Sequence, residues 1–183
     1  MDLKFLAIVQ ARVGSTRFPG KVLKKINGKS LIEILLFRLS QSRKIDKIVL
    51  ATSQNKENNH LETLVQNLGY EVYRGSEKNV LSRYYEIAKK HRPEVIIRIT
   101  GDCPIIDYNI VDEIITIYEK EKFDYLSNTF PPSFPDGLDV ELFTYNCLAD
   151  AYKNAKSSHE KEHVTPYMRG DNSYKKFNLA NSI

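Results

Sequence analysis

The chain has 183 residues, 42% of them hydrophobic and 27% charged, with a formal net charge of +4 at pH 7. This length and balance are typical of one globular domain, and the scattered basic residues do not predict binding to nucleic acid. Two cysteines exclude a disulfide framework or a four-cysteine zinc site, and no apolar run approaches the roughly 20 residues of a membrane span. With no signal peptide visible at the N-terminus, we expect a cytoplasmic protein.

Strands and helices alternate along the first two thirds of the chain. Apolar runs typical of buried strands occupy residues 4–9, 47–51, 71–74, 95–100 and 124–127. Helices are predicted between them over residues 30–42, 57–68, 79–91 and 109–122. Ser30 and Glu33 form a capping-box pattern, Gly69 suits a helix end, and Asn79 suits a helix start. This order predicts a mostly parallel α/β sheet with ligands bound at the carboxyl ends of its strands.

The last third of the chain loses this alternation. Residues 130–137 form an irregular, proline-rich loop, and residues 138–143 are predicted as a strand with Asp139 and Glu141 on one face. Helices are expected over residues 147–156 and 160–169, followed by a brief strand over residues 175–179. Because no segment reads as a linker, we expect a single domain over residues 1–183.

The loop after the first strand has the composition of an anion site. Residues 10–21 include Arg12, Arg17 and Lys21 together with two hydroxyl side chains and two glycines. Glycine lets the backbone approach a ligand, arginine binds phosphate oxygens in pairs, and lysine adds a point charge. The spacing matches neither a Walker loop nor the dinucleotide-binding pattern. We interpret the loop as phosphate-binding, the alternative being a solvent-exposed basic turn.

Asp102 follows the fourth predicted strand. A lone carboxylate at that position suits a Mg²⁺ ion that also contacts phosphate oxygens, whereas the alternative is an aspartate that caps a turn or helix. The neighbouring Cys103 has no evident base beside it, so we interpret it as a small buried side chain rather than a nucleophile.

Acidic residues mark two further candidate stretches. Asp136, Asp139 and Glu141 fall within six residues and suit hydrogen bonds to substrate hydroxyls or a metal; the alternative is a polar turn and edge strand. Glu162 and His163 lie in a charged and aromatic segment that otherwise reads as a solvated helix start. No arrangement of these residues matches a zinc site.

Four ordered blocks resemble the cytidylyltransferase family that makes CMP-sugars. They are IVQARVGSTRFPGK at residues 8–21, TGDCPIID at 100–107, PDGLDVE at 135–141 and EHVTPY at 162–167. The resemblance is strongest to the spore-coat polysaccharide biosynthesis branch and more distant to the CMP-Kdo and acylneuraminate synthetases. It implies a three-layer, Rossmann-like and glycosyltransferase-A-like nucleotidyltransferase with a mostly parallel mixed sheet. The implied reaction transfers CMP from CTP to a sugar acid with Mg²⁺, releases pyrophosphate and serves surface polysaccharide synthesis, in a homodimer.

The same resemblance implies roles for individual residues. Arg12, Lys21 and Asp102 would be catalytic, and Asp102 would hold the metal. The nucleotide would lie against Ala11, Arg12, Gly14, Ser15, Arg17, Lys21, Thr52, Ser53 and Arg83. The sugar side would be lined by Asp136, Asp139, Glu162 and His163.

The chain departs from the family pattern in two places. The sequence ends at Ile183, before the segment reading roughly Asp-x-Pro-Glu-Asp that carries the family's second metal-binding aspartate, so we expect a domain without that C-terminal segment. Asn79 stands where relatives often carry an acidic residue. Two other functions therefore stay open. One is transfer from another nucleotide or a nucleotide-sugar on the same fold, and the other is an inactive nucleotide-binding domain.

Overall fold

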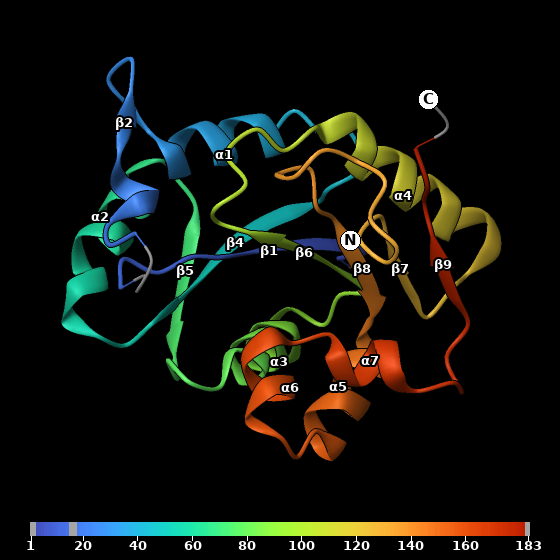
Figure 1. Ribbon diagram of the computed structural model, residues 1–183. Helices are drawn as coiled ribbons and strands as arrows, with labels where there is room; N and C mark the ends of the chain where they lie inside the picture. The colour runs from blue at the N-terminus through green and yellow to red at the C-terminus, as the bar shows by residue number, and fades with distance from the viewer. Residues whose placement is uncertain (1–2, 15–17, 182–183) are drawn as a thin grey trace.

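A computed structural model describes residues 3–14 and 18–181 (Figure 1). Within these residues the main sheet has seven strands in the order β5-β4-β1-β6-β8-β7-β9. They are β1 (Phe5–Gln10), β4 (Lys47–Ser53), β5 (Glu71–Gly75), β6 (Val95–Thr100), β7 (Tyr125–Ser127), β8 (Glu141–Thr144) and β9 (Lys176–Asn178). Only β8 runs antiparallel to its neighbours, β6 and β7. The predicted mostly parallel mixed sheet is confirmed.

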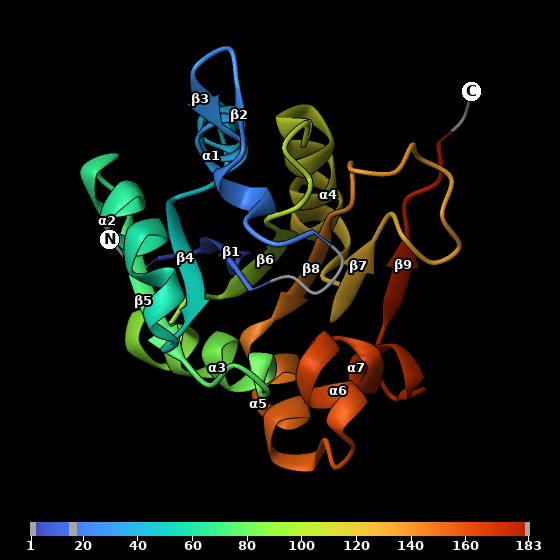
Figure 2. The same ribbon diagram turned by 60° about the vertical axis from the view of Figure 1, so that its left-hand side comes forward.

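Helices cover both faces of this sheet and complete three layers (Figures 1 and 2). One face carries α1 (Leu31–Leu39), α2 (Asn59–Asn67) and α4 (Tyr108–Glu121). The other carries α3 (Val80–His91), α5 (Tyr145–Asn154), α6 (Ser158–His163) and α7 (Pro166–Gly170). Strand β1 is buried between them, because Phe5, Ala7 and Val9 pack in one core and Leu6 and Ile8 in the other. In the described parts of the chain, every helix is too short or too polar to cross a membrane.

The residues predicted to begin or end helices do so in the structure. The Ser30 backbone N–H donates to Glu33 Oε2 at 2.7 Å, and the Glu33 N–H donates to Ser30 Oγ, which completes the capping box of α1. Asn79 Oδ1 accepts from the Ser82 N–H at 2.9 Å and begins α3. Gly69 follows α2 with φ +86°, a conformation that glycine adopts without a Cβ penalty.

A small hairpin was not predicted from the sequence. Strands β2 (Lys25–Ile26) and β3 (Lys29–Ser30) pair around Asn27 and Gly28, whose φ angles of 49° and 81° are both positive. Asn-Gly favours such a two-residue turn, and the hairpin projects from the body beside α1 (Figure 2). The signal was missed because the flanking strands, each only two residues long, are too short to show an alternating pattern.

The strand predicted over residues 138–143 is wrong at its start. Strand β8 begins only at Glu141, which leaves Asp139 in the preceding loop. Asn128 explains the difference, because its side chain donates to the Leu138 carbonyl and accepts from the Val140 N–H, both at 2.8 Å. These side-chain bonds replace the strand-to-strand bonds that the alternating pattern predicts.

The helix predicted over residues 160–169 is also wrong, because it is broken in two. The chain leaves the helical conformation at Val164, where φ is 71°, and α7 begins at Pro166. Proline lacks the N–H that would continue the earlier helix, and it suits the first turn of a new one. Two other helices begin at slightly different residues from those predicted. A 3-10 turn over Lys56–Asn58 precedes α2, and Asp107 is the N-terminal cap of α4.

The carboxyl ends of β1 and β6 lie unusually close at Gly101. The Gly101 N–H donates to the Gln10 carbonyl at 2.7 Å. A Cβ atom on Gly101 would lie 2.6 Å from Ala11 Cβ and 2.8 Å from the Gln10 oxygen. A residue larger than glycine would therefore force the two strand ends apart.

Gly101→Ala is expected to lower the free energy of unfolding by about 1–3 kcal/mol, the usual cost of overpacking. Gly170→Ala is the matched control, because a Cβ there meets nothing within 4 Å. Chemical denaturation of both variants checks this. Equal stability of the two variants would contradict the close-approach explanation.

Candidate functional site

A cleft of about 650 Å³ opens at the carboxyl ends of β1 and β6. Its other walls come from the start of α3, the loop before β8, and the end of α6. Parallel α/β sheets bind their ligands at this edge. The cleft brings together eight of the predicted site residues: Ala11, Arg12, Lys21, Arg83, Asp102, Asp136, Glu162 and His163.

The loop after β1 is anchored by a buried asparagine. Asn58 Oδ1 accepts a hydrogen bond from the Val13 N–H at 2.9 Å. The Val13 carbonyl accepts one from the Gly20 N–H, also at 2.9 Å. The Asn58 Nδ2 group donates to Ser53 Oγ at 2.8 Å. Ser53 was predicted on the nucleoside side, but it is fully buried and supports the loop through Asn58. Asn58 itself was missed, because it falls in the polar first turn of the helix predicted over residues 57–68 and carries no signal there of a buried contact.

Several predicted nucleotide contacts do not line the cleft. Ser15 and Arg17 lie outside the described residues. Thr52 is fully buried, and its Oγ1 has no hydrogen-bond partner within the described chain. Gly14 lies against Glu57, since a Cβ atom there would come within 2.2 Å of Glu57 Oε1. Glycine at this position lets the loop pass a neighbouring carboxylate.

Two arginines converge on the cleft. Arg12 Nη1 lies 3.1 Å from Glu77 Oε1, and Glu77 also accepts from the Asn55 side chain. Arg83 is 3% exposed, and its Nε has no hydrogen-bond partner within the described residues. Burial lowers the pKa of Arg83, and the nearby positive charge of Arg12 lowers it further. An anion between these arginines would relieve their repulsion.

A lysine and carboxylates meet on the other side of the cleft. Lys21 Nζ lies 3.5 Å from Asp102 Oδ2, and the Asp102 side chain is half exposed. Burial raises the pKa of Asp139, and the negative charges of Asp136, Glu141 and Asp102 raise it further. This excess of negative charge fits a divalent cation with oxygen ligands. However, the described residues contain no group of three or more His, Cys, Asp or Glu side chains arranged to hold a metal unaided.

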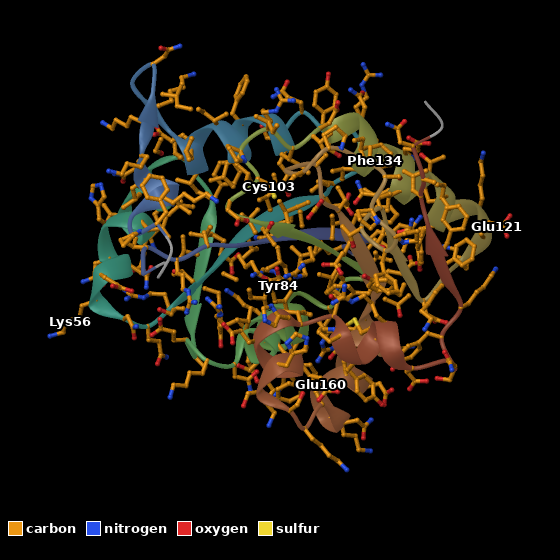
Figure 3. All side chains as sticks on the ribbon, viewed as in Figure 1. Lys56, Tyr84, Cys103, Glu121, Phe134 and Glu160 are labelled. Atoms are coloured by element: carbon orange, nitrogen blue, oxygen red, sulfur yellow. The ribbon has the colours of Figure 1, made fainter. Side chains whose placement is uncertain are left out.

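Cys103 is not placed for nucleophilic chemistry. It is 6% exposed, and burial raises the pKa of its thiol. Its Sγ lies 3.1 Å from Thr100 Oγ1. Figure 3 shows Cys103 on one side of the sheet and Tyr84 of α3 on the other. These observations fit the predicted role of a small buried side chain.

A buried ion pair joins β6 to β8 beside the cleft. Arg98 and Glu141 face each other in the antiparallel register, and Arg98 Nη1 donates to Glu141 Oε2. Glu141 Oε1 also accepts from Tyr125 Oη at 2.5 Å and Thr165 Oγ1 at 2.7 Å. Burial alone would raise the pKa of Glu141, but Arg98 and the two hydroxyl groups outweigh it and lower the pKa. Arg98 was missed because it interrupts an otherwise apolar strand.

The comparisons with known proteins agree with this geometry. The family model for cytidylyltransferase matches residues 6–181, so the chain belongs to the cytidylyltransferase family and is a nucleotidyltransferase that uses CTP. The spore coat polysaccharide biosynthesis protein SpsF of Bacillus subtilis is 38% identical over 169 residues, 90% of this chain and 69% of that protein.

One further relative and one solved structure are also similar to this chain. The 3-deoxy-manno-octulosonate cytidylyltransferase of Chlamydia pneumoniae is 37% identical over 113 residues, which cover 60% of this chain and 43% of that protein. A solved cytidylyltransferase structure from Leptospira borgpetersenii is similar with a TM-score of 0.90 at 30% identity, covering 100% of this chain and 77% of that one. The predicted family and fold class are both confirmed.

Glu141→Ala is expected to lower the free energy of unfolding by about 3–5 kcal/mol, because it leaves Arg98 buried without a countercharge. Tyr125→Phe is the control, since it removes one hydrogen bond to Glu141 and should cost about 1 kcal/mol. Urea denaturation measures both values. A cost for Glu141→Ala no larger than that of Tyr125→Phe would contradict the role of the ion pair.

Proposed function

We propose that the protein transfers CMP from CTP to a hydroxyl group of a sugar acid and releases pyrophosphate, in the synthesis of surface polysaccharide. The observation that carries this proposal is the meeting of Arg12, Lys21 and Asp102 at the carboxyl ends of β1 and β6, in a member of the cytidylyltransferase family. The acceptor class and the pathway are supported by the two named relatives, one acting on 3-deoxy-manno-octulosonate and one in spore coat polysaccharide synthesis.

The residues of the cleft would act by positioning the two substrates and by neutralising charge on the phosphates. Arg12, Arg83 and Lys21 would bind the triphosphate and neutralise charge that develops on its oxygens. Glu162 and His163, across the cleft, would hold the acceptor so that its hydroxyl oxygen attacks the α-phosphorus in line with the departing pyrophosphate. The acceptor oxygen loses its proton to water and gains a bond to phosphorus as the bond to pyrophosphate breaks.

The proposal includes Mg²⁺ at Asp102. This carboxylate is accessible in the cleft, and Asp136 lines the same cleft, so both suit a cation that phosphate oxygens would also ligate. When bound, the ion would withdraw negative charge from the phosphates. The expected cytoplasmic location belongs to the same proposal, and so does the homodimer that the family resemblance implies.

Arg12→Ala and Lys21→Ala are each expected to weaken CTP binding by about 10- to 100-fold, the loss of one charge-assisted contact. Lys25→Ala is the control, because Lys25 is an exposed residue of the β2–β3 hairpin outside the cleft. Isothermal titration with CTP and Mg²⁺ gives the affinities. If both cleft variants bind CTP as tightly as Lys25→Ala does, the phosphate-loop assignment is wrong.

Asp102→Asn is expected to slow Mg²⁺-dependent pyrophosphate release at least about 100-fold, because an amide carries no charge to hold the cation. Glu113→Gln on the exposed surface of α4 is the control and should keep full activity. Pyrophosphate release is followed across a Mg²⁺ titration. Unchanged Mg²⁺ dependence in Asp102→Asn would remove Asp102 from the metal site.

A further inference from the structure

A second cavity, of about 680 Å³, lies at the opposite end of β6 from the main cleft. Among the described residues, none lines both cavities. The walls of the second cavity come from the ends of α3 and α4 and from the start of α5. Its volume falls within the roughly 300–1,000 Å³ of a small-molecule site. The cavity is therefore large enough to hold a ligand of its own.

The interior of this second cavity is aromatic. Tyr118 and Pro93 are buried and form its floor, whereas Tyr85 and Tyr145 are half-buried in its walls. The Tyr85 ring stacks on Tyr152 of α5, with the ring centroids 4.0 Å apart and the planes within 5°, so its place in the wall is fixed. Tyrosine rings pack well against other rings. The interior therefore suits the ring of a ligand.

Four consecutive basic residues at the end of α3 lie beside this cavity and divide into two pairs. Lys90 Nζ and His91 Nε2 lie 2.7 Å and 3.0 Å from Glu71 Oε1 of β5. Lys89 and Arg92 instead line the cavity and are exposed. Neither of their side chains makes an ion pair or hydrogen bond within the described chain. Two positive charges at the rim are therefore available to a ligand.

The acidic side chain of the cavity, Glu94, is already bound. Its Oε1 accepts hydrogen bonds from Tyr118 Oη at 2.7 Å and from Lys122 Nζ at 3.0 Å. Burial alone would raise the pKa of Glu94, but these two contacts outweigh it and lower the pKa. Because Lys122 balances Glu94, the charges of Lys89 and Arg92 remain without a counterion in the described residues.

Arg92 occupies its place at the rim at a cost to the backbone. Its φ is 50°, the left-handed conformation in which glycine or asparagine usually ends a helix. A residue with a longer side chain is strained in this conformation. Strained positions of this kind are concentrated at sites that bind ligands. The backbone of Arg92 therefore agrees with a binding role for its guanidinium.

We propose that this cavity is a second ligand site, which binds a phosphate monoester through Lys89 and Arg92 and packs the ring of the same molecule against its tyrosines. A phosphate monoester carries a charge of about −1.5 to −2 at pH 7, which matches the two unpaired cations. Asn146, exposed at the rim, can exchange hydrogen bonds with polar groups on the ring. Binding there does not depend on the reaction proposed for the main cleft, because the two sites lie at opposite ends of β6.

Calorimetric titration with AMP, D-glucose 6-phosphate and inorganic phosphate tests the proposal. At least one of the two monoesters should bind the unmodified protein about tenfold more tightly than inorganic phosphate, because its ring contacts the tyrosines. Lys89→Met and Arg92→Asn should each weaken that binding about tenfold, the loss of one charge-assisted contact. Asparagine tolerates the left-handed conformation at position 92, so this variant keeps the end of α3.

Lys90→Met is the matched control, because Lys90 is the next lysine of the same helix and contacts Glu71 instead of lining the cavity. This variant should bind the monoester as the unmodified protein does, and so should Lys21→Ala, which removes a cation of the main cleft. Tighter binding of AMP assigns the ring to a nucleobase, and tighter binding of glucose 6-phosphate assigns it to a sugar. The proposal is overturned if neither monoester binds more tightly than inorganic phosphate, or if Lys89→Met and Arg92→Asn bind it as tightly as Lys90→Met. It is also overturned if Lys21→Ala is the variant that loses binding.

Discussion

The close contact between the ends of β1 and β6 is the constraint on which the site depends. Gly101 allows its N–H to reach the Gln10 carbonyl at 2.7 Å, and that approach brings the loop after β1 beside Asp102. Lys21 and Asp102 then meet on one side of the cleft, although they are far apart in the sequence. A larger side chain at Gly101 would separate the groups proposed to bind phosphate from the one proposed to bind metal.

The reversal of strand direction at β8 builds the second half of the site. Strand β8 pairs antiparallel with β6, and Arg98 and Glu141 face each other across that pair. The buried charges are supported by Tyr125 of β7 and Thr165, which precedes α7. This network holds Arg98 in the lining of the cleft. The parallel half of the sheet therefore carries most of the groups proposed to bind the nucleotide, and the antiparallel half lies beside the helix that carries Glu162 and His163, the groups proposed to bind the acceptor.

Local signals predicted the parallel half of the fold well. The Ser30 cap, the Asn79 cap and the apolar strands depend on neighbouring residues, so a single sequence shows them. The loop before β8 could not be predicted in the same way, because its shape depends on Asn128, a residue of another segment. The prediction that Ser53 contacts the nucleotide was made without knowledge of its true partner. The Ser53 hydroxyl accepts a hydrogen bond from the Asn58 side chain, and only the folded chain shows that contact.

The cleft is proposed to join CMP to a sugar acid, and the products of the reaction test this directly. The most direct measurement incubates the chain with Mg²⁺, sugar acids and each of CTP, UTP, ATP and GTP, and quantifies pyrophosphate and the nucleotide-sugar product by mass spectrometry. The account predicts equal amounts of pyrophosphate and CMP-sugar, formed from CTP in preference to the other nucleotides and only when a sugar acid is present. Product formed equally from all four nucleotides, or CTP binding without any product, would contradict it.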